Sequence, residues 1–498
     1  MSASAGWHQT WVTTTNHTAA DTHDSGGLAA WPSAVVTTPV LSQTPLGIAH
    51  SARAPLLMYS LEQLRSGELA GINRLDLCCN LTDFPEEIFS LADSLEVLNL
   101  SGNRLSALPA DLACLYKLRI VFCSNNLFTS VPEVLGTCTQ LEMIGFKSNR
   151  IQHLPATALP PKLRWLILTD NQLQQLPPEL GDCAHLQKLM LAGNQLRALP
   201  ESLANLQRLE LVRIAANRLE HLPAWLTALP SLSWLAFAGN PFSDASETAI
   251  LQQHPLPTIA RDTLELGEIL GQGASGVIHS ATWQQPNQPA QAMAVKLFKG
   301  DITSDGLAHS EMAACIAAGE HNNLISVAGP LEPLQDAPPG LLLACIQPSF
   351  QPLAGPPSLA SCTRDCYAEQ RRFTVAEALR ILRDTSAAVV HLHQRGILHG
   401  DLYAHNLLVD PAGQTLLGDF GAASFFDPQS NNGIALQQLE ARAFACLLEE
   451  LLVRCNKDDQ ATQQTLLWHL HARCNHPQPA ERPLFAEIQA CLQACAGW

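Results

Sequence analysis

The chain lacks three features that would assign it to a broad class at once. No stretch approaches the roughly 20 uninterrupted apolar residues of a membrane span. The N-terminus has neither the basic start nor the compact apolar run of a secretory signal peptide. Positive charge is scarce, because 29 Lys and Arg stand against 45 Asp and Glu, a net charge of −16. This balance argues against nucleic acid or an anionic membrane as the main partner.

Charge of either sign is modest, at 15% of residues, whereas apolar residues make up 47%. This composition can build hydrophobic cores and excludes a wholly disordered chain. Since 498 residues exceed what one core supports, we expect two or three domains. The fifteen cysteines are scattered, with no disulfide framework and no paired zinc-site spacing. They predict buried, reduced thiols in a cytoplasmic protein.

The first 55 residues are rich in Ser, Thr, Ala, Pro and Gly and have no apolar periodicity. We expect this extension, residues 1–55, to be disordered. Order is expected from Met58, which would also serve as a start. In SLEQLRSGEL (60–69), Ser60 is a suitable N-cap and predicts a short helix that caps the next region of the chain.

The clearest feature of the sequence is an asparagine that recurs every 22 or 23 residues. Each ends a pattern of the form L-x-x-L-x-L-x-x-N, as in LEVLNLSGN and LQKLMLAGN. The asparagines are Asn80, Asn103, Asn126, Asn149, Asn171, Asn194, Asn217 and Asn240. A fixed period of this size predicts a solenoid whose leucines fill one continuous core. The asparagine side chains can satisfy backbone groups of the turns, so we assign them a structural role.

This pattern resembles the leucine-rich repeat family over residues 72–243. Solenoids of this kind usually function through the concave sheet, at strand positions that alternate with the core leucines. Apolar residues at such positions predict an exposed patch that binds a protein partner. They are Phe122, Met143, Trp165, Ile167 and Trp234. The alternative is that these residues contact another part of the same chain.

Two prolines in the stretch HPLPT discourage helix after the last repeat. We therefore predict a linker at residues 251–263. It would separate a repeat domain with its helical cap, at 56–250, from a second domain at 264–498.

The second domain opens with a glycine motif, Gly271-x-Gly273-x-x-Gly276-Val277. Alone this motif is weak evidence, compatible with a dinucleotide fold or a surface loop. Apolar residues on both sides of the glycines favour strand–turn–strand, and no acidic residue follows at the position that a ribose would need. Glycines here would let backbone N–H groups approach phosphate oxygens closely.

Further motifs follow the glycines in a fixed order. AMAVKLF has strand character, and HSEMAACIAAG has helical character. The residues that stand out are Ala294, Lys296, Glu311, His399-Gly400-Asp401-Leu402, Asn406 and Asp419-Phe420-Gly421. In this order they resemble the signature of the protein kinase family, over about residues 264–495.

The resemblance implies a bacterial-type fusion of a leucine-rich repeat solenoid and a eukaryotic-like protein kinase domain. The fold class would be multidomain, an α/β solenoid followed by an α+β, bilobal kinase-like domain. By resemblance, the ATP site would be formed by Gly271, Gly273, Gly276, Val277, Ala294 and Lys296.

The resemblance also implies roles for the remaining residues of the signature. Lys296 would pair with Glu311. Asp401 would accept or orient the substrate hydroxyl proton, and Asn406 with Asp419 would hold Mg²⁺.

The sequence departs from the family pattern at Gly400, where an Arg ordinarily meets a phosphate on the activation segment. That segment, 422–439, has eighteen residues, no Ala-Pro-Glu, and only Ser424 and Ser430 as hydroxyls. Arg482, whose family partner is the missing Glu, loses its expected salt bridge. We interpret the lost Arg as the consequence of a lost phosphosite, and this interpretation predicts that Gly400→Arg changes little.

A second departure lies two and four residues after Asp401, where kinases commonly place a Lys or an Arg. Here Tyr403 and His405 occupy these positions. One hypothesis is that protonated His405 supplies part of the missing positive charge near the γ-phosphate, so that activity falls as the pH rises from about 6 to 8. The alternative is a histidine stacked in the loop without a catalytic role.

The sequence therefore predicts a cytoplasmic protein kinase with ATP and Mg²⁺ as cofactors and a repeat module that recruits a protein partner. Serine or threonine is preferred to tyrosine as acceptor, although the catalytic loop does not decide between them. Two alternatives stay open. One is an ATP-binding scaffold that transfers nothing, and the other is a kinase of a small-molecule hydroxyl, because the short activation segment leaves little platform for a peptide.

Overall fold

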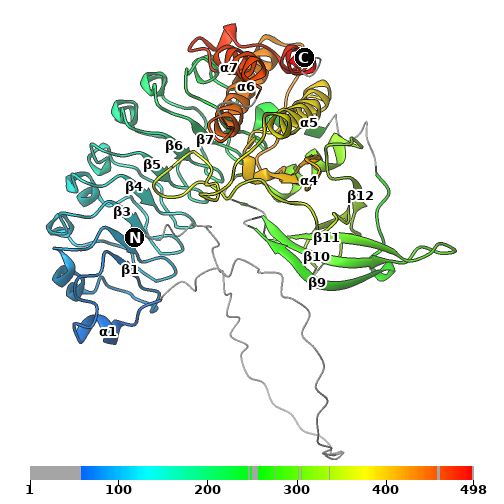
Figure 1. The fold of residues 1–498 in the computed structure, drawn as a ribbon. Coiled ribbons are helices and arrows are strands. Elements are labelled where there is room, and N and C mark those ends of the chain that lie inside the picture. Colours follow the sequence, from blue (N-terminus) through cyan, green and yellow to red (C-terminus); the bar gives the residue numbers. More distant parts are fainter. Residues whose placement is uncertain are drawn as a thin grey trace, which may run out of the picture.

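The computed structural model describes residues 58–244, 247–248, 256–273, 275–300, 302–303, 305–335, 337–456 and 460–495. A curved repeat solenoid lies at the left of Figure 1, a strand-rich lobe lies at the right, and a helical lobe lies at the top. The predicted disorder of residues 1–55 falls outside the described residues, as does the first part of the predicted linker.

The solenoid begins with helix α1 (Leu61–Arg65), where the Ser60 hydroxyl accepts a hydrogen bond from the Gln63 backbone N–H at 3.1 Å. This confirms the predicted cap helix. Eight parallel strands follow and pair in sequence order. They are β1 (Arg74–Asp76), β2 (Val97–Asn99), β3 (Ile120–Phe122), β4 (Met143–Gly145), β5 (Trp165–Ile167), β6 (Lys188–Met190), β7 (Leu211–Arg213) and β8 (Trp234–Ala236).

The other side of the repeats consists of short 3₁₀ helices and one short α-helix. Most start directly after a proline, whose fixed φ suits a helix start and whose missing N–H is not needed there. The 3₁₀ helices are Glu86–Leu91, Leu112–Cys114, Glu133–Thr137, Ala156–Ala158, Pro178–Asp182 and Glu201–Asn205, and helix α2 is Ala224–Thr227.

The recurring asparagines tie each repeat to its neighbour. Asn194 is buried, its Oδ1 accepts from the Leu173 N–H at 3.0 Å, and its Nδ2 donates to the carbonyls of Leu168 and Leu191, both at 2.9 Å. The same arrangement recurs at Asn103, Asn126, Asn149, Asn171, Asn217 and Asn240. The predicted structural role of these residues is confirmed.

The strand-rich lobe holds a five-stranded sheet in the order β12-β13-β11-β10-β9. Its strands are β9 (Leu264–Gln272), β10 (Gly276–Trp283), β11 (Gln291–Phe298), β12 (Val327–Pro330) and β13 (Gly340–Ala344), and its helix is α4 (Ala308–Ala318). Since β9 and β10 are antiparallel and joined at the glycine motif, the predicted strand–turn–strand is confirmed.

The helical lobe is built on α5 (Val375–Gln394), α6 (Asn431–Leu452), α7 (Ala461–Cys474) and α8 (Phe485–Cys495). Two small sheets accompany these helices. One contains β14 (Gln351–Pro352), β16 (Leu407–Val409) and β17 (Thr415–Leu417), and the other pairs β15 (Ile397–Leu398) with β18 (Ser424–Phe425).

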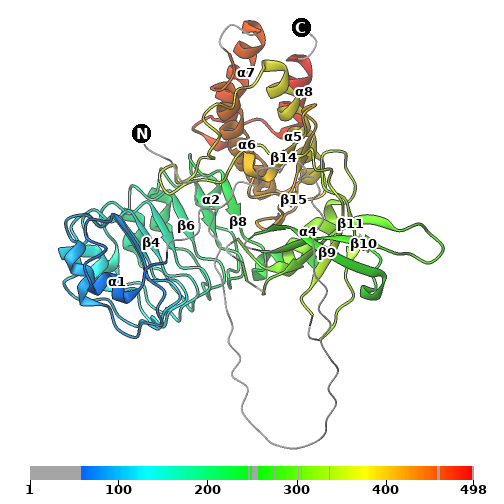
Figure 2. The same cartoon turned by 60° about the horizontal axis from the view of Figure 1, so that its bottom comes forward.

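The concave face of the solenoid packs against the helical lobe of the same chain (Figures 1 and 2). Side chains of strands β3–β8 share one hydrophobic core with α5, α6 and the loop 353–373, which is drawn in yellow. The prediction of an exposed patch is therefore wrong, because each of its residues has at most 7% of its surface exposed. The residues concerned are Phe122, Met143, Trp165, Ile167 and Trp234. They contact another part of the chain, as the alternative held.

Within the described ranges, no helix is both long and apolar enough to cross a membrane. All fifteen cysteines are free thiols. Four of them are exposed and not buried as expected, namely Cys78, Cys79, Cys114 and Cys345.

We expect Asn194→Ala to lower the free energy of unfolding by about 3 kcal/mol or more, because it leaves buried backbone groups without partners. Asn80→Gly is the matched control: Asn80 occupies the equivalent place in the first repeat, is exposed and has a φ of 54°. Glycine tolerates that φ, so we expect Asn80→Gly to change the free energy of unfolding little. Denaturant unfolding of both variants measures the difference, and equal losses would contradict the structural role of the buried ladder.

Candidate functional site

The site is built where the strand-rich lobe meets the helical lobe. Lys296 lies in β11 and Glu311 in the first turn of α4, and the two side chains form a buried ion pair. Burial opposes a charge on Lys296, but the carboxylates of Glu311 and Asp419 raise its pKa above the usual range. The lysine is therefore held as a cation beside two carboxylates.

Asp419 is brought to the same place by the turn after β17. A Cβ atom at Gly421 would lie 3.2 Å from Asp419 Oδ1 and 3.7 Å from Glu311 Oε2, so the two carboxylates converge there. Asp419 has a φ of 56° and its Oδ1 accepts from the Gly421 N–H at 3.2 Å. A tight backbone turn thus fixes its carboxylate.

The glycine turn leaves room beside this group. A Cβ atom at Gly271 or Gly273 would meet nothing within 4 Å, whereas one at Gly276 would lie 2.5 Å from the Leu297 carbonyl oxygen. Close strand packing therefore requires glycine at 276, and open space adjoins the other two. Exposed backbone at a glycine turn, a buried lysine and hard oxygen donors fit a nucleotide phosphate and Mg²⁺.

The loop that carries Asp401 and Asn406 follows β15, and a residue of α6 anchors it. The Glu440 carboxylate accepts from the Gly400 N–H at 2.8 Å and contacts His393 Nε2 at 2.7 Å. Asn406 Nδ2 donates to both the backbone oxygen and Oδ2 of Asp401, each at 2.9 Å. These contacts bring the predicted residues Asp401 and Asn406 together and fix their orientation.

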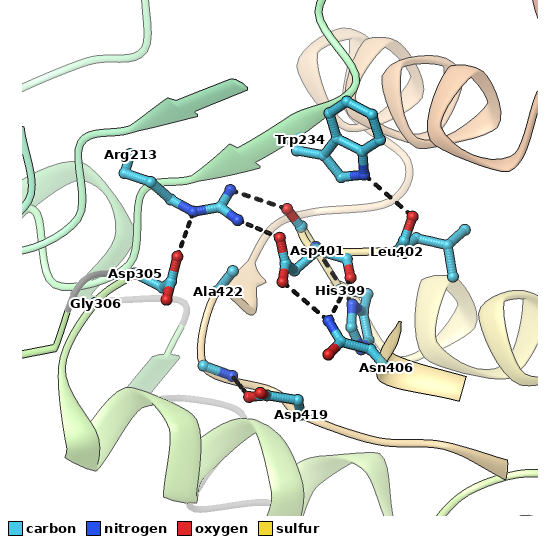
Figure 3. A network of polar contacts seen from close by, with 12 residues as sticks. Arg213, Trp234, Asp305, Gly306, His399, Asp401, Leu402, Asn406, Asp419 and Ala422 are labelled. Carbon is cyan, nitrogen blue, oxygen red and sulfur yellow. Dashed lines mark hydrogen bonds and ion pairs between the residues drawn. The ribbon is translucent and has the colours of Figure 1, made fainter. Parts of the chain in front are cut away.

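The other oxygen of Asp401 is bound by a residue of the repeat domain, Arg213 at the end of β7 (Figure 3). Its guanidinium also donates to the Gly400 carbonyl at 3.1 Å and to Asp305 Oδ1 at 2.7 Å. Burial would raise the pKa of Asp401, but the charges of Arg213 and then of His405 and His399 hold it below its usual range. Asp401 is thus a carboxylate with hydrogen bonds on both oxygens.

Position 400 is not free to vary, and the interpretation that Gly400→Arg changes little is contradicted. Gly400 is buried with a φ of 72°. A Cβ atom there would lie 2.5 Å from the Leu235 carbonyl oxygen in β8 and 2.6 Å from that of Ala422. The backbone of the repeat domain occupies the space that any side chain would need, so glycine is required for docking.

Tyr403 and His405 do not extend freely from the loop. The Tyr403 ring stacks on Trp234 of β8 with centroids 4.1 Å apart, and Trp234 Nε1 donates to the Leu402 carbonyl at 3.1 Å. His405 Nδ1 lies 2.8 Å from Asp365 Oδ1. Burial lowers the pKa of His405, but the hydrogen bond to Asp365 and the charge of that carboxylate raise it overall. The predicted catalytic role of His405 stays a prediction.

The short activation segment also docks on the repeat domain. Ser424 is buried and accepts from the Phe237 N–H at 3.0 Å, while Ser430 caps α6. Arg482, which lacks its expected glutamate, donates to the Pro230 carbonyl at 2.6 Å. The hydroxyls of both serines are thus engaged in hydrogen bonds of the fold, and the loss of a phosphosite stays a prediction.

Sequence reasoning missed three residues of this site, namely Arg213, Asp305 and Glu440. Arg213 carried one signal, because it is a lone cation in a largely apolar row of concave positions. Neither Asp305 nor Glu440 was assigned a role from the motifs, and only the three-dimensional arrangement reveals their contacts.

Comparisons with known proteins agree with this architecture. The family model described as protein tyrosine and serine/threonine kinase matches residues 264–446. Models of the leucine rich repeat match residues 161–219 and 94–115. The chain therefore contains leucine-rich repeats followed by a domain of the protein kinase type, as the motifs predicted.

Individual relatives match smaller parts. The chain is similar to the "Probable inactive serine/threonine-protein kinase roco10" of Dictyostelium discoideum, 34% identical over 162 residues, which are 30% of this chain and 6% of that protein. It is also similar to fibroblast growth factor receptor 1 of Pleurodeles waltl and of Xenopus laevis, 23% and 22% identical over 50% and 49% of this chain. These matches cover 31% of each receptor, so the chain spans less than a third of each of these relatives.

We expect Gly400→Ala to destabilise the protein more than Gly300→Ala does. Both glycines have nearly the same φ, 72° and 71°, but a Cβ atom at Gly300 would meet nothing within 4 Å. Gly300→Ala should therefore lose only the stability that a left-handed backbone costs a residue with a side chain, about 1–2 kcal/mol. Gly400→Ala must in addition displace two carbonyl groups. Thermal unfolding measures both variants, and equal melting temperatures would contradict the close approach of the repeat domain.

Proposed function

We propose that the chain is an ATP- and Mg²⁺-dependent protein kinase that phosphorylates protein hydroxyl groups. The observation that carries this proposal is the convergence of Lys296, Glu311 and Asp419 beside the glycine turn, together with an Asp401–Asn406 pair held by backbone and side-chain hydrogen bonds. Transfer of a phosphoryl group requires positioning and charge neutralisation more than covalent chemistry by the protein.

Each residue has a role in this proposal. The glycine turn, with Val277 and Ala294, would cover the nucleotide, and Lys296 would bind its phosphates while Glu311 holds the lysine in place. Asn406 and Asp419 would hold Mg²⁺. ATP would supply the γ-phosphoryl group, and the metal ion would neutralise charge on the phosphates. Asp401 would orient the acceptor hydroxyl and take up its proton.

Serine or threonine is the acceptor that we propose, and the cytoplasm is the location, since free thiols suit a reducing compartment. A protein partner of the repeats is still proposed, but not on the concave row, because that row contacts the kinase domain.

A nucleotide-binding scaffold is the second candidate function. Two observations favour it: both oxygens of Asp401 already have partners in the chain, and one relative is named a probable inactive kinase. A kinase of a small-molecule hydroxyl is the third candidate, because the repeat domain covers the loop beside Asp401 and restricts access for a peptide.

Asp401→Asn separates the first candidate from the second. With Mg²⁺ and ATP, we expect the purified wild type to phosphorylate itself or a generic protein substrate, and the variant to lose about 10² or more of this rate. Mass-spectrometric mapping of the phosphorylated residues reports activity and acceptor type together. No incorporation by the wild type would support the scaffold, and equal incorporation by both proteins would indicate a contaminating kinase.

Lys296→Met tests nucleotide binding independently of phosphoryl transfer. Loss of a charge-assisted contact, with Glu311 and Asp419 left facing the phosphates, should weaken Mg-ATP binding by about tenfold or more. Lys299→Met is the control, because Lys299 lies three residues further along the same stretch and is exposed. Titration calorimetry measures both, and equal affinities for the two variants would contradict a phosphate site at Lys296.

A further inference from the structure

The catalytic loop has no cation of the usual kind beside its aspartate. Position 400 is glycine, and the positions two and four residues after Asp401 hold Tyr403 and His405. The Tyr403 side chain is buried under Trp234, and the His405 ring is bound to Asp365. Among the described residues, no hydrogen bond or ion pair joins either side chain to the Asp401 carboxylate, and the charge of His405 acts on it only through space.

A cation nevertheless reaches Asp401, from the other domain. The side chain of Arg213 is only 2% exposed and its three guanidinium nitrogens each have a partner. Two of these partners belong to the loop, the Gly400 carbonyl and Asp401 Oδ1, and the third is Asp305. Figure 3 shows the guanidinium between the two carboxylates, pointing from β7 toward the loop. This forked geometry fixes orientation in a way that a point charge does not.

The contact is part of an extensive apolar interface between the two domains. The concave side chains and the helical lobe form one continuous hydrophobic core. Polar contacts surround it, such as those of Arg442 with the Pro230 carbonyl and the Ser233 hydroxyl, both at 3.2 Å. Domains joined by a large apolar interface do not move apart readily. Arg213 is therefore a resident part of the site, and 18% of the Asp401 side chain is still exposed beside it.

We propose that Arg213 of the repeat domain is a positioning residue of the kinase site, which holds the Asp401 carboxylate in its working orientation and supplies the direct cationic contact that no side chain of the catalytic loop makes with it. This inference rests on the proposed phosphotransfer function. The guanidinium fixes Oδ1 and Asn406 fixes Oδ2, so that the carboxylate cannot rotate. The repeat domain is then a structural component of the active site, and the kinase domain is incomplete without it.

The test compares Arg213→Ala, Arg213→Lys and Lys188→Met in the full chain. Lys188 is the matched control, because it is a buried cation on the neighbouring strand β6 that packs 4.4 Å from the Trp165 ring centroid. The measurements are kcat, KM for ATP, the melting temperature, and the recovery of activity when guanidinium is added at millimolar concentration.

We expect Arg213→Ala to lower kcat by about 10²-fold through misplacement of Asp401, with KM for ATP changed by less than about twofold because the nucleotide side is untouched. Arg213→Lys should be intermediate, because it restores charge without the fork. Added guanidinium should restore activity to Arg213→Ala and not to Asp401→Asn, a result that a merely structural role would not produce. Lys188→Met should keep its kcat.

Two results would overturn the proposal. Activity of Arg213→Ala equal to or above that of the wild type would identify the arginine as a block on Asp401, and a loss without recovery by guanidinium would identify a structural role only. If the wild type transfers no phosphoryl group, the proposed function fails. In that case, the amide hydrogen-exchange rates of residues 400–406 in the wild type and in Arg213→Ala test the positioning contact. Equal rates in the two proteins would refute it.

Discussion

The packing of the concave sheet against the catalytic loop is the contact on which the rest of the site depends. The Leu235 carbonyl lies so close to residue 400 that only glycine fits. Trp234 stacks on Tyr403, and Arg213 binds Asp401. These residues come from two adjacent strands, β7 and β8, so one edge of the solenoid fixes the loop from one side, while Glu440, Asn406 and Asp365 hold it within the kinase domain.

This contact accounts for the departures from the kinase pattern as one set. An arginine at 400 would clash, and the guanidinium of Arg213 binds the loop instead. Arg482 has lost the glutamate of the activation segment and donates to the Pro230 carbonyl. The buried Ser424 contacts the Phe237 N–H. In each case a group of the repeat domain contacts a position where the sequence departs from the kinase pattern, which favours adaptation to the repeat domain over decay.

The sequence predicted what depends on periodicity and local chemistry. The asparagine period gave the solenoid, and the ordered motifs gave the Lys296–Glu311 pair and the strand–turn–strand at the glycines. It did not predict the contact between the domains. Apolar residues such as Phe122 and Trp165 give the same sequence pattern whether a protein partner or another part of the same chain covers them. The importance of Gly400 was likewise hidden, because the obstacle at that position is a backbone carbonyl 165 residues earlier, in Leu235.

The arrangement places opposite demands on Asp401. Arg213 and Asn406 immobilise the carboxylate, which favours an aligned acceptor hydroxyl, but the charge of Arg213 also lowers the pKa of Asp401 and weakens it as a base. In a loose transition state the acceptor proton leaves late, so alignment contributes more than basicity. A firmly held, weakly basic aspartate is therefore compatible with phosphoryl transfer. The arrangement restricts access to Asp401, since an acceptor hydroxyl in the proposed reaction would have to approach the part of its side chain that the repeats leave exposed.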